Sequence, residues 1–237
     1  MSESPPPPSP SDLPPVAPIS QETARLVALL ERMAGEYTGG AGSQTAALAR
    51  EEFVRATGRV HEGDHSFDER MAQFMEWFLL DRPDPDTGVT PCERWAAEHA
   101  ANLDPGDRAR LLALATSHRS AFTPAGREVA GGWLVLDLLY GFQWVVAVDA
   151  PLPGLDPGDV FEGRLAAPRA EVHFTGAFCY HPPEVAARIR RHLERVAHTG
   201  RRHESVLDHL MAMRLAYDRA EGVPAHRIYR FGATRGP

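Results

Sequence analysis

The chain has 237 residues, of which 43% are hydrophobic and 24% charged, a composition typical of a soluble globular protein with one full core or two small domains. All 25 basic residues are arginine, which excludes the classes that need a lysine: P-loop nucleotide-binding proteins, Schiff-base enzymes and protein kinases. No charged-then-apolar leader opens the chain, and the only cysteines, Cys92 and Cys179, form no disulfide framework. We therefore expect a cytoplasmic protein without a membrane anchor.

The formal net charge of −7 is unevenly distributed along the chain. From Glu184 onward there are 11 arginines and 6 acids, a net charge of +5, whereas the preceding part has 14 arginines and 26 acids, a net charge of −12. A basic C-terminal part can contact an anionic partner, or it can pair with the acidic body of the same chain.

The N-terminal half predicts a leader followed by helices. Residues 1–19 are rich in proline and lack apolar periodicity, which indicates a disordered leader; a polyproline ligand is the alternative. Residues 20–118 form a helical region. Its helices are expected to begin at Ser20, near Ser43, at a Ser66–Glu69 capping box, at a Thr90–Glu93 capping box and at Asp104.

The helix after Ser66 has the strongest apolar stripe, with large side chains at helical spacing. Its members are Phe67, Met71, Phe74, Met75 and Phe78. Trp77 widens the stripe, so we expect that side chain to be largely buried.

The apolar period changes to two in residues 119–181, which predicts strands. The most apolar run, residues 131–149, is interrupted by Asp137 and by Tyr140–Gly141, so it favours a hairpin over a membrane span. Other strands are expected around residues 121–129, 161–165 and 172–178. About five short antiparallel strands with glycine at the bends predict a small, partly closed β-barrel.

Residues 182–237 predict two C-terminal helices. The expected fold class is therefore α+β: a helical N-terminal half, a small five-stranded antiparallel β-barrel, and two C-terminal helices packed back on it.

Arginines lie away from the apolar stripe of the first C-terminal helix, and arginine side chains bind phosphate and carboxylate groups well. Aromatic side chains that would stack on bases are absent from this stretch, which favours a protein partner over nucleic acid. The candidate partner-binding residues are Arg188, Arg190, Arg191, Arg195, Arg201, Arg202, Met213 and Tyr217.

Four spaced motifs carry a resemblance to a known family. Their residues are Trp77, Phe78 and Asp81; Thr90 and Glu93; Asp137, Leu138 and Gly141; and Gly158, Asp159 and Arg164. Over about half its length the chain resembles the core of a poorly characterised bacterial family whose members often carry an attached SEC-C zinc motif. The resemblance implies a fold of helices plus a small barrel. The cysteine–histidine cluster of the zinc motif is missing, so no metal is implied.

A narrower similarity, in size, composition and the lack of a catalytic motif, is to bacterial cell-polarity regulators that act with a response-regulator partner on a Ras-like GTPase. It implies another protein as the partner, either a small GTPase or a response regulator.

The histidines are the candidate metal ligands of the chain, and Cys92 is a candidate nucleophile. His61 and His65 share a loop with two acids, but an exposed polar loop is the better reading; the group of His198, His203 and His209 lacks helical ligand spacing. Cys92 lies near a helix N-terminus and would need His99 or His118 as a base, without any nucleophile motif around it. Residues 179–181 only end a strand. We expect no metal, no cofactor and no catalytic residue.

These patterns favour a regulatory or adaptor protein that is not an enzyme and that binds another protein. The alternatives are nucleic-acid binding through the basic C-terminal helix and an unrecognised cysteine- or metal-dependent hydrolase.

Overall fold

The computed structural model describes residues 20–127, 132–148, 155–197 and 203–231, and the structural statements below concern these residues. The leader, residues 1–19, lies outside them.

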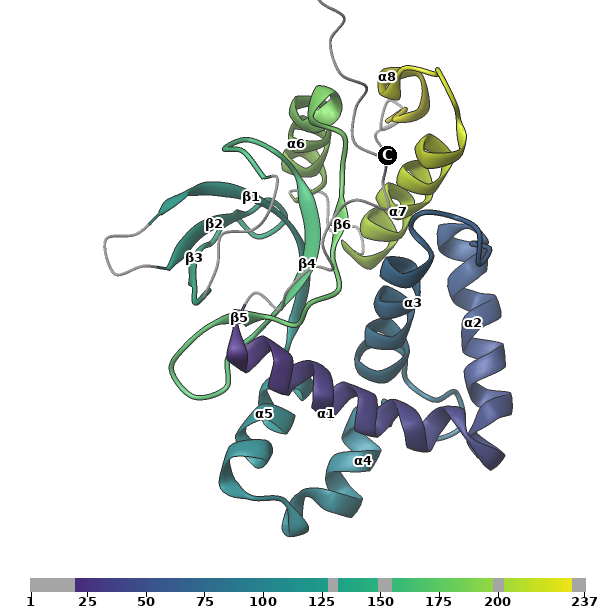
Figure 1. The fold of residues 1–237 in the computed structure, drawn as a ribbon, viewed down its shortest axis with the longest axis vertical. Helices are drawn as coiled ribbons and strands as arrows, with labels where there is room; N and C mark the ends of the chain where they lie inside the picture. The colour runs from purple at the N-terminus through teal and green to yellow at the C-terminus, as the bar shows by residue number, and fades with distance from the viewer. Residues whose placement is uncertain (1–19, 128–131, 149–154, 198–202, 232–237) are drawn as a thin grey trace, which may run out of the picture.

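The described chain is a mixture of helices and strands, as the sequence predicts (Figure 1). The helices are α1 (Gln21–Thr38), α2 (Ser43–Thr57), α3 (Phe67–Glu76), α4 (Pro91–His99), α5 (Pro105–Ala115), α6 (Pro183–Ala197), α7 (His203–Arg219) and α8 (Ala225–Ile228). The strands are β1 (His118–Arg127), β2 (Trp133–Asp137), β3 (Gln143–Val146), β4 (Phe161–Ala166), β5 (His173–Phe174) and β6 (Cys179–Tyr180). The C-terminal part thus has a third, short helix, α8, that the sequence did not predict.

In Figure 1 the sheet lies on the left, with α6 above it, α1 and α5 below it, and α2, α3 and α7 to its right. α1 packs against α2, α4 and α5 and contacts β5, while α7 packs on α2, β1 and β6. None of the helices in the described part of the chain is both long and apolar enough to cross a membrane.

Three helix starts show the capping that the sequence predicts. The hydroxyl of Ser20 accepts a hydrogen bond from the backbone N–H of Thr23 at 2.9 Å. Thr90 and Glu93 form a capping box, and Asp104 accepts bonds from two backbone N–H groups of α5.

The predicted Ser66–Glu69 capping box is wrong. Ser66 has φ −93° and ψ 13°, outside the extended region that an N-cap residue adopts, and its hydroxyl makes no capping bond. The helix still begins at Phe67, because burial of its apolar face, rather than a capping hydrogen bond, fixes its position. Phe74 and Phe78 are buried, whereas Trp77 is only half-buried, with its ring centroid 5.5 Å from that of Phe53. Trp77 therefore packs against the core beside the buried stripe, as the sequence predicts, and keeps part of its surface exposed.

The strands form one curled sheet in the order β3-β2-β1-β4-β5, with β6 paired to β4, and all the pairings are antiparallel. The sheet is a curled half-barrel rather than a closed barrel, so the small, partly closed β-barrel that the sequence predicts is confirmed only in its antiparallel, curled form. Its two edges are joined in the described chain by one isolated bridge, between Val146 and Val172, where Ala147 donates to the carbonyl of Val172 at 2.8 Å.

The barrel stays open because the strand expected over residues 172–178 is split into β5 and β6. Between them Gly176 has φ +107°, a conformation that favours glycine, and a Cβ there would lie 3.3 Å from Val27 of α1. The chain therefore bends at Gly176, and β5 is too short to form a ladder with β3.

The two faces of the sheet differ in chemistry because successive side chains point to opposite sides. One face is aromatic and carries a cluster that includes Phe122, Phe161, Phe174 and Phe178. The other face, on β1 and β4, carries charged side chains covered by α3 and α7. We call this set the buried charged layer; its members are Arg119, Glu162 and Arg164 of the sheet with Glu76, Asp81 and Asp208.

Motif residues have structural roles in this arrangement. Arg164 is only 2% exposed and pairs with Asp81, and its Nε lies 3.4 Å from Glu76 Oε2. Asp137 is fully buried and accepts hydrogen bonds from the hydroxyl of Ser120 at 2.6 Å and from two backbone N–H groups of the β2–β3 turn. These motifs therefore join the sheet to α3 and fix the hairpin.

Candidate partner-binding surface and pocket

α6 is a strongly amphipathic helix. Its inner stripe is buried in the core and consists of Val185, Ala186, Ile189, His192, Leu193 and Val196. Arg188, Arg191 and Arg195, at i, i+3 and i+7, share the opposite side of the helix, while Arg190 lies on a flank near Gly158.

None of these four arginines is in an ion pair with a residue that the structure describes. Arg188 Nη1 donates instead to the carbonyl of His226 at 2.9 Å, and Arg195 Nε donates to the carbonyl of Arg191 at 3.1 Å. Their positive charge is therefore not neutralised within the described fold.

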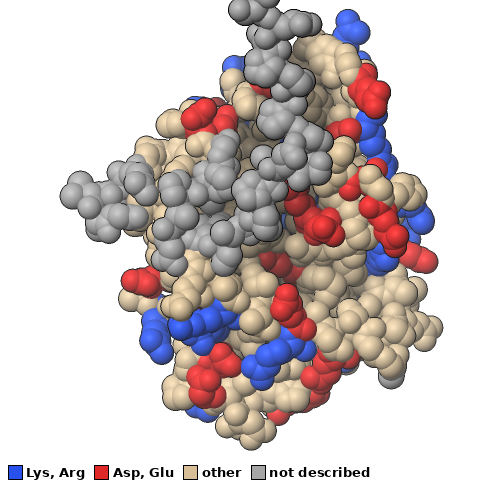
Figure 2. Space-filling view, viewed as in Figure 1, with Lys and Arg blue, Asp and Glu red and all other residues tan. Residues whose placement is uncertain are grey.

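Charges elsewhere on the surface are more evenly matched. Figure 2 shows positive and negative side chains side by side over the lower part of the face, where α1 and α5 lie in Figure 1. There Arg32 pairs with Asp107 at 3.0 Å and Arg110 with Glu22 at 2.6 Å, and the Arg110 guanidinium holds the pKa of Glu22 below its usual value against a smaller opposing effect of burial.

α8 packs on α6. Arg227 on α8 and Arg230, two residues after its end, are exposed and likewise in no ion pair with a described residue. We call the arginines on the outer side of α6, on α8 and just after α8 the arginine face; its members are the half-buried Arg188 and the exposed Arg191, Arg195, Arg227 and Arg230. Because both helices are anchored in the core, this face is a fixed array of cations rather than a mobile tail.

The other residues assigned to the partner surface lie elsewhere. Met213 is 6% exposed and packs in the core, so we leave it out of the proposed surface. Tyr217 is half-buried, and its hydroxyl donates to Glu184 at 3.4 Å, which places it beside the start of α6. Arg201 and Arg202 lie outside the described residues.

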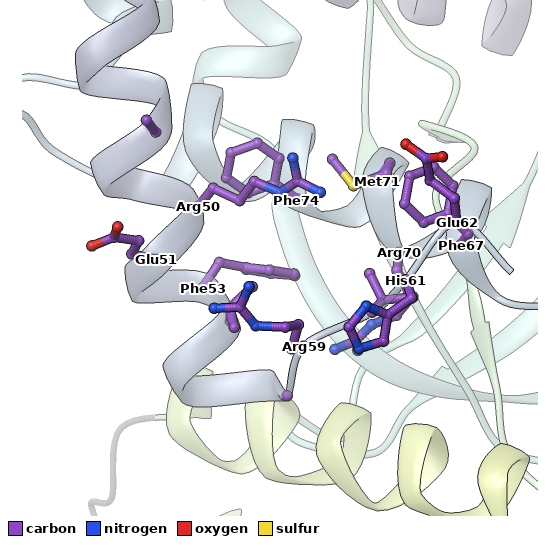
Figure 3. A pocket seen from close by; sticks show the side chains of 14 residues that line it. Arg50, Glu51, Phe53, Arg59, His61, Glu62, Phe67, Arg70, Met71 and Phe74 are labelled. Carbon is purple, nitrogen blue, oxygen red and sulfur yellow. The ribbon is translucent and has the colours of Figure 1, made fainter. Parts of the chain in front are cut away.

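A pocket of ≈ 600 Å³ lies between α2, α3 and the loop that joins them (Figure 3). Its apolar lining includes Phe53, Phe67, Met71 and Phe74. Polar side chains on the same lining are Arg50, Glu51, Arg59, His61, Glu62 and Arg70. The pocket could accommodate an apolar group that carries an anionic end.

Arg70 gives this pocket its most unusual group. Its side chain is buried, its Nη2 donates to the carbonyl of Thr57 at 2.7 Å, and its guanidinium lies 5.6 Å from the ring centroid of Phe53. Within the described structure its Nε and Nη1 have no hydrogen-bond partner, and burial lowers its pKa. The sequence did not reveal this pocket, because its lining comes from three segments that only the packing of α2 on α3 brings together.

The loop histidines do not form a metal centre with the neighbouring acids. Asp64 accepts hydrogen bonds from Arg219 and from the backbone N–H of His61, and His61 itself lines the pocket. In the described chain neither His61 nor His65 belongs to a group of ligand-type side chains close enough to share an ion. The ring of His203 makes an edge-to-face contact with the ring of Tyr140, His209 is exposed, and His198 lies outside the described residues.

Cys92 is buried at the start of α4, and burial raises the pKa of its thiol to about 12, which opposes nucleophilic chemistry. The expected base residues face acids: His99 lies 3.2 Å from Glu36, and His118 lies 2.6 Å from Asp137. No hydrogen bond in the described structure joins Cys92 to either histidine, so this arrangement does not support a cysteine hydrolase at Cys92.

Comparison of the chain with protein-family models, with curated proteins and with solved structures gives no match. The resemblance inferred from the motifs therefore stays a prediction.

Proposed function

We propose that this protein is a non-enzymatic regulator or adaptor that binds an acidic surface of another protein through the arginine face. The observation that carries the proposal is that the arginines of the arginine face, all exposed except the half-buried Arg188, have no ion-pair partner in the described fold. Arginine is enriched in protein interfaces, where its planar guanidinium forms paired hydrogen bonds with carboxylates.

A protein partner is favoured over nucleic acid by what accompanies the arginines. No aromatic side chain lies on the exposed side of α6 in the described chain, whereas binding of single strands uses aromatic rings that stack on bases. Glu184 and Glu194 are also exposed on α6, and the body before α6 has a net charge of −12. Such acids repel a polyanion but can pair with a partner that carries both signs of charge.

The narrower candidates for the partner are a small Ras-like GTPase and a response regulator. They come from the resemblance in size and composition, and the arginine face supplies the complementary charge that an acidic patch on either protein would need. The cytoplasmic location that such a partner requires is part of the same proposal.

The test is partner capture with charge-reversed variants, followed by reconstitution with the purified partner. Arg188→Glu with Arg191→Glu reverses two charges of the arginine face and is expected to weaken binding by at least tenfold, because each reversal places like charges together. Arg50→Glu with Arg55→Glu is the matched control, since these arginines are exposed on α2 and in no ion pair with a described residue. The control should bind like wild type, and both variants should melt like wild type.

Binding to an unrelated duplex DNA and an unrelated single-stranded RNA is measured in parallel at physiological salt. The proposal expects weak binding to both. Sub-micromolar affinity that is lost in the α6 variant and falls steeply with added salt would show that the arginine face binds nucleic acid rather than a protein. Partner capture that is equal in wild type and in the α6 variant would refute the arginine face as the binding surface.

A further inference from the structure

Three side chains that commonly ligate metals meet on the charged face of the sheet. Glu162 on β4 lies directly opposite Cys179 on β6, and His181 follows two residues after Cys179, so all three side chains point to the same side. One ligand atom from each lies within 4.8 Å of the other two. The exposed fractions of Glu162, Cys179 and His181 are 2%, 3% and 4%, so the cluster is shielded from water.

Two of these ligand atoms have no hydrogen-bond partner in the described structure. Glu162 Oε1 and His181 Nε2 face each other at 3.3 Å without forming a hydrogen bond. The two atoms are close enough for an ion pair if the ring is protonated, but neither forms a hydrogen bond. Buried polar atoms normally form hydrogen bonds, so two adjacent ones without any are candidates for ligands of a shared ion.

The other polar atoms of the same side chains are already held. Glu162 Oε2 accepts from Arg119 Nη2 at 3.2 Å, and His181 Nδ1 lies 2.9 Å from the hydroxyl of Tyr229. A histidine that binds a metal through one ring nitrogen usually makes a hydrogen bond through the other, which fixes the orientation of the ring. Tyr229 is fully buried and is in the right place for this role.

We propose that Glu162, Cys179 and His181 bind one divalent ion of the zinc class. Thiolate, imidazole and carboxylate are the ligands that zinc takes in proteins. Bonds of about 2.0–2.3 Å place the atoms of a tetrahedral site about 3.3–3.8 Å apart. Glu162 Oε1 and His181 Nε2 already have this separation, so ion binding requires mainly that the sulfur of Cys179, within 4.8 Å of the other ligand atoms, moves closer to them. Cys179 loses its proton to solvent when the sulfur–metal bond forms, so one proton is released for each ion bound.

The charges around the cluster are compatible with a cation. Arg119, Arg70 and Arg214 are the positive groups close to the cluster. Arg119 is matched by Asp208 at 3.1 Å as well as by Glu162, and Arg214 pairs with Asp218 at 2.7 Å. Arg70 donates to the carbonyl of Thr57 and interacts with both Glu162 and Cys179. An ion of charge +2 that replaces the thiol proton adds one net positive charge to this layer.

The test uses the full chain made without a histidine tag and stripped of metal with a chelator. Titration with zinc, monitored by calorimetry, is expected to show about one strong binding site per chain. Titration with cobalt is expected to give a thiolate-to-cobalt absorption band, which reports directly on Cys179. Cys179→Ser and His181→Gln should each weaken zinc binding by about 100-fold or more, and Tyr229→Phe by about 10- to 100-fold.

Two control variants separate this site from other groups on the chain. Cys92→Ser removes the other buried cysteine, and His99→Gln disrupts the exposed group of Glu36, Glu98 and His99, whose ligand atoms also lie within 4.8 Å of one another. Both should keep the zinc site and the cobalt band.

Wild-type protein that binds no zinc at micromolar concentration, or that gives no thiolate band with cobalt, overturns the proposal by itself. This outcome does not depend on whether the ligand variants fold. Zinc binding that is lost in His99→Gln and kept in Cys179→Ser would assign the ion to the exposed group instead. The proposal stands independently of the arginine face, since α6 supplies none of the ligands.

Discussion

The arginines of α6 and the arginines beneath the sheet place the same side chain in opposite environments. Arg191 and Arg195 are exposed and in no ion pair with a described residue, whereas Arg164 is 2% exposed and is held between Glu76 and Asp81. The buried guanidinium is fixed by its acids and belongs to the architecture, while the exposed ones remain available to another molecule. Burial and pairing, rather than residue type, separate an arginine that holds the fold from one that can bind a partner.

The largest effect is expected from Arg164→Met, which removes the buried cation and keeps most of its bulk. Glu76, whose pKa burial already raises, and Asp81 would lose their partner, at a cost of about 3–5 kcal/mol in the free energy of unfolding. Denaturant unfolding followed by fluorescence measures the change. Recovery in a triple variant that adds Glu76→Gln and Asp81→Asn would show that unpaired acids cause the loss. A cost below about 1 kcal/mol would mean that the buried charged layer does not hold α3 to the sheet.

An intermediate effect on the free energy of unfolding is expected from Asp137→Asn, which removes the charge of a buried acid as Arg164→Met removes that of a buried base. Burial raises the pKa of Asp137, but hydrogen bonds from His118 and Ser120 outweigh it and hold the pKa below its usual value. A lowered pKa means that the charged form stabilises the fold at neutral pH, and that this stability is lost as the pH falls through the folded-state pKa. The substitution should cost about 2 kcal/mol at neutral pH, because it weakens charge-assisted hydrogen bonds.

The pH dependence of the melting temperature checks this sign. The difference between wild type and Asp137→Asn should be largest near neutral pH and should shrink in acid. A difference that grows as the pH falls would contradict the direction of the shift.

The smallest effect is expected from Arg191→Met with Arg195→Met on the arginine face. Neither side chain is in an ion pair with a described residue, so the free energy of unfolding should change by less than about 0.5 kcal/mol. The same denaturant titration as for Arg164→Met makes the comparison direct. A loss of more than about 1 kcal/mol would place these arginines among the structural ones.

Much of the fold follows from local signals in the sequence. Ser20, Thr90 and Asp104 begin their helices because each side chain reaches backbone N–H groups two or three residues ahead. Gly141, with φ +73°, turns the β2–β3 hairpin where the Tyr140–Gly141 pair predicts it. Such signals act over a few residues, so a single sequence contains them.

The errors have long-range causes. The alternation from Val172 to Phe178 is typical of one strand, but contact with Val27 of α1 requires glycine at residue 176 and a bend. Ser66 has the right residue type for a cap, but its backbone follows the preceding loop.

The candidate sites also divide into one that local sequence signals predict and one that depends on long-range contacts. The arginines of α6 could be found in the sequence because helical spacing alone places them on one side. Glu162, Cys179 and His181 could not, since only the register between β4 and β6 brings Glu162 opposite Cys179. The prediction that no metal binds rests on the histidines of the loop and of the last helices. The sequence pattern of residues 179–181 indicates only the end of a strand.

The last turn of the helix that contains α3 is π-helical, over Trp77–Asp81, and the backbone N–H of Arg82 reaches the carbonyl of Trp77, five residues back, at 3.0 Å. Such a turn contains one residue more than a regular α-helical turn, and one residue rotates a helix by about 100°. Shortening the segment by one residue would therefore swing the Asp81 carboxylate away from Arg164.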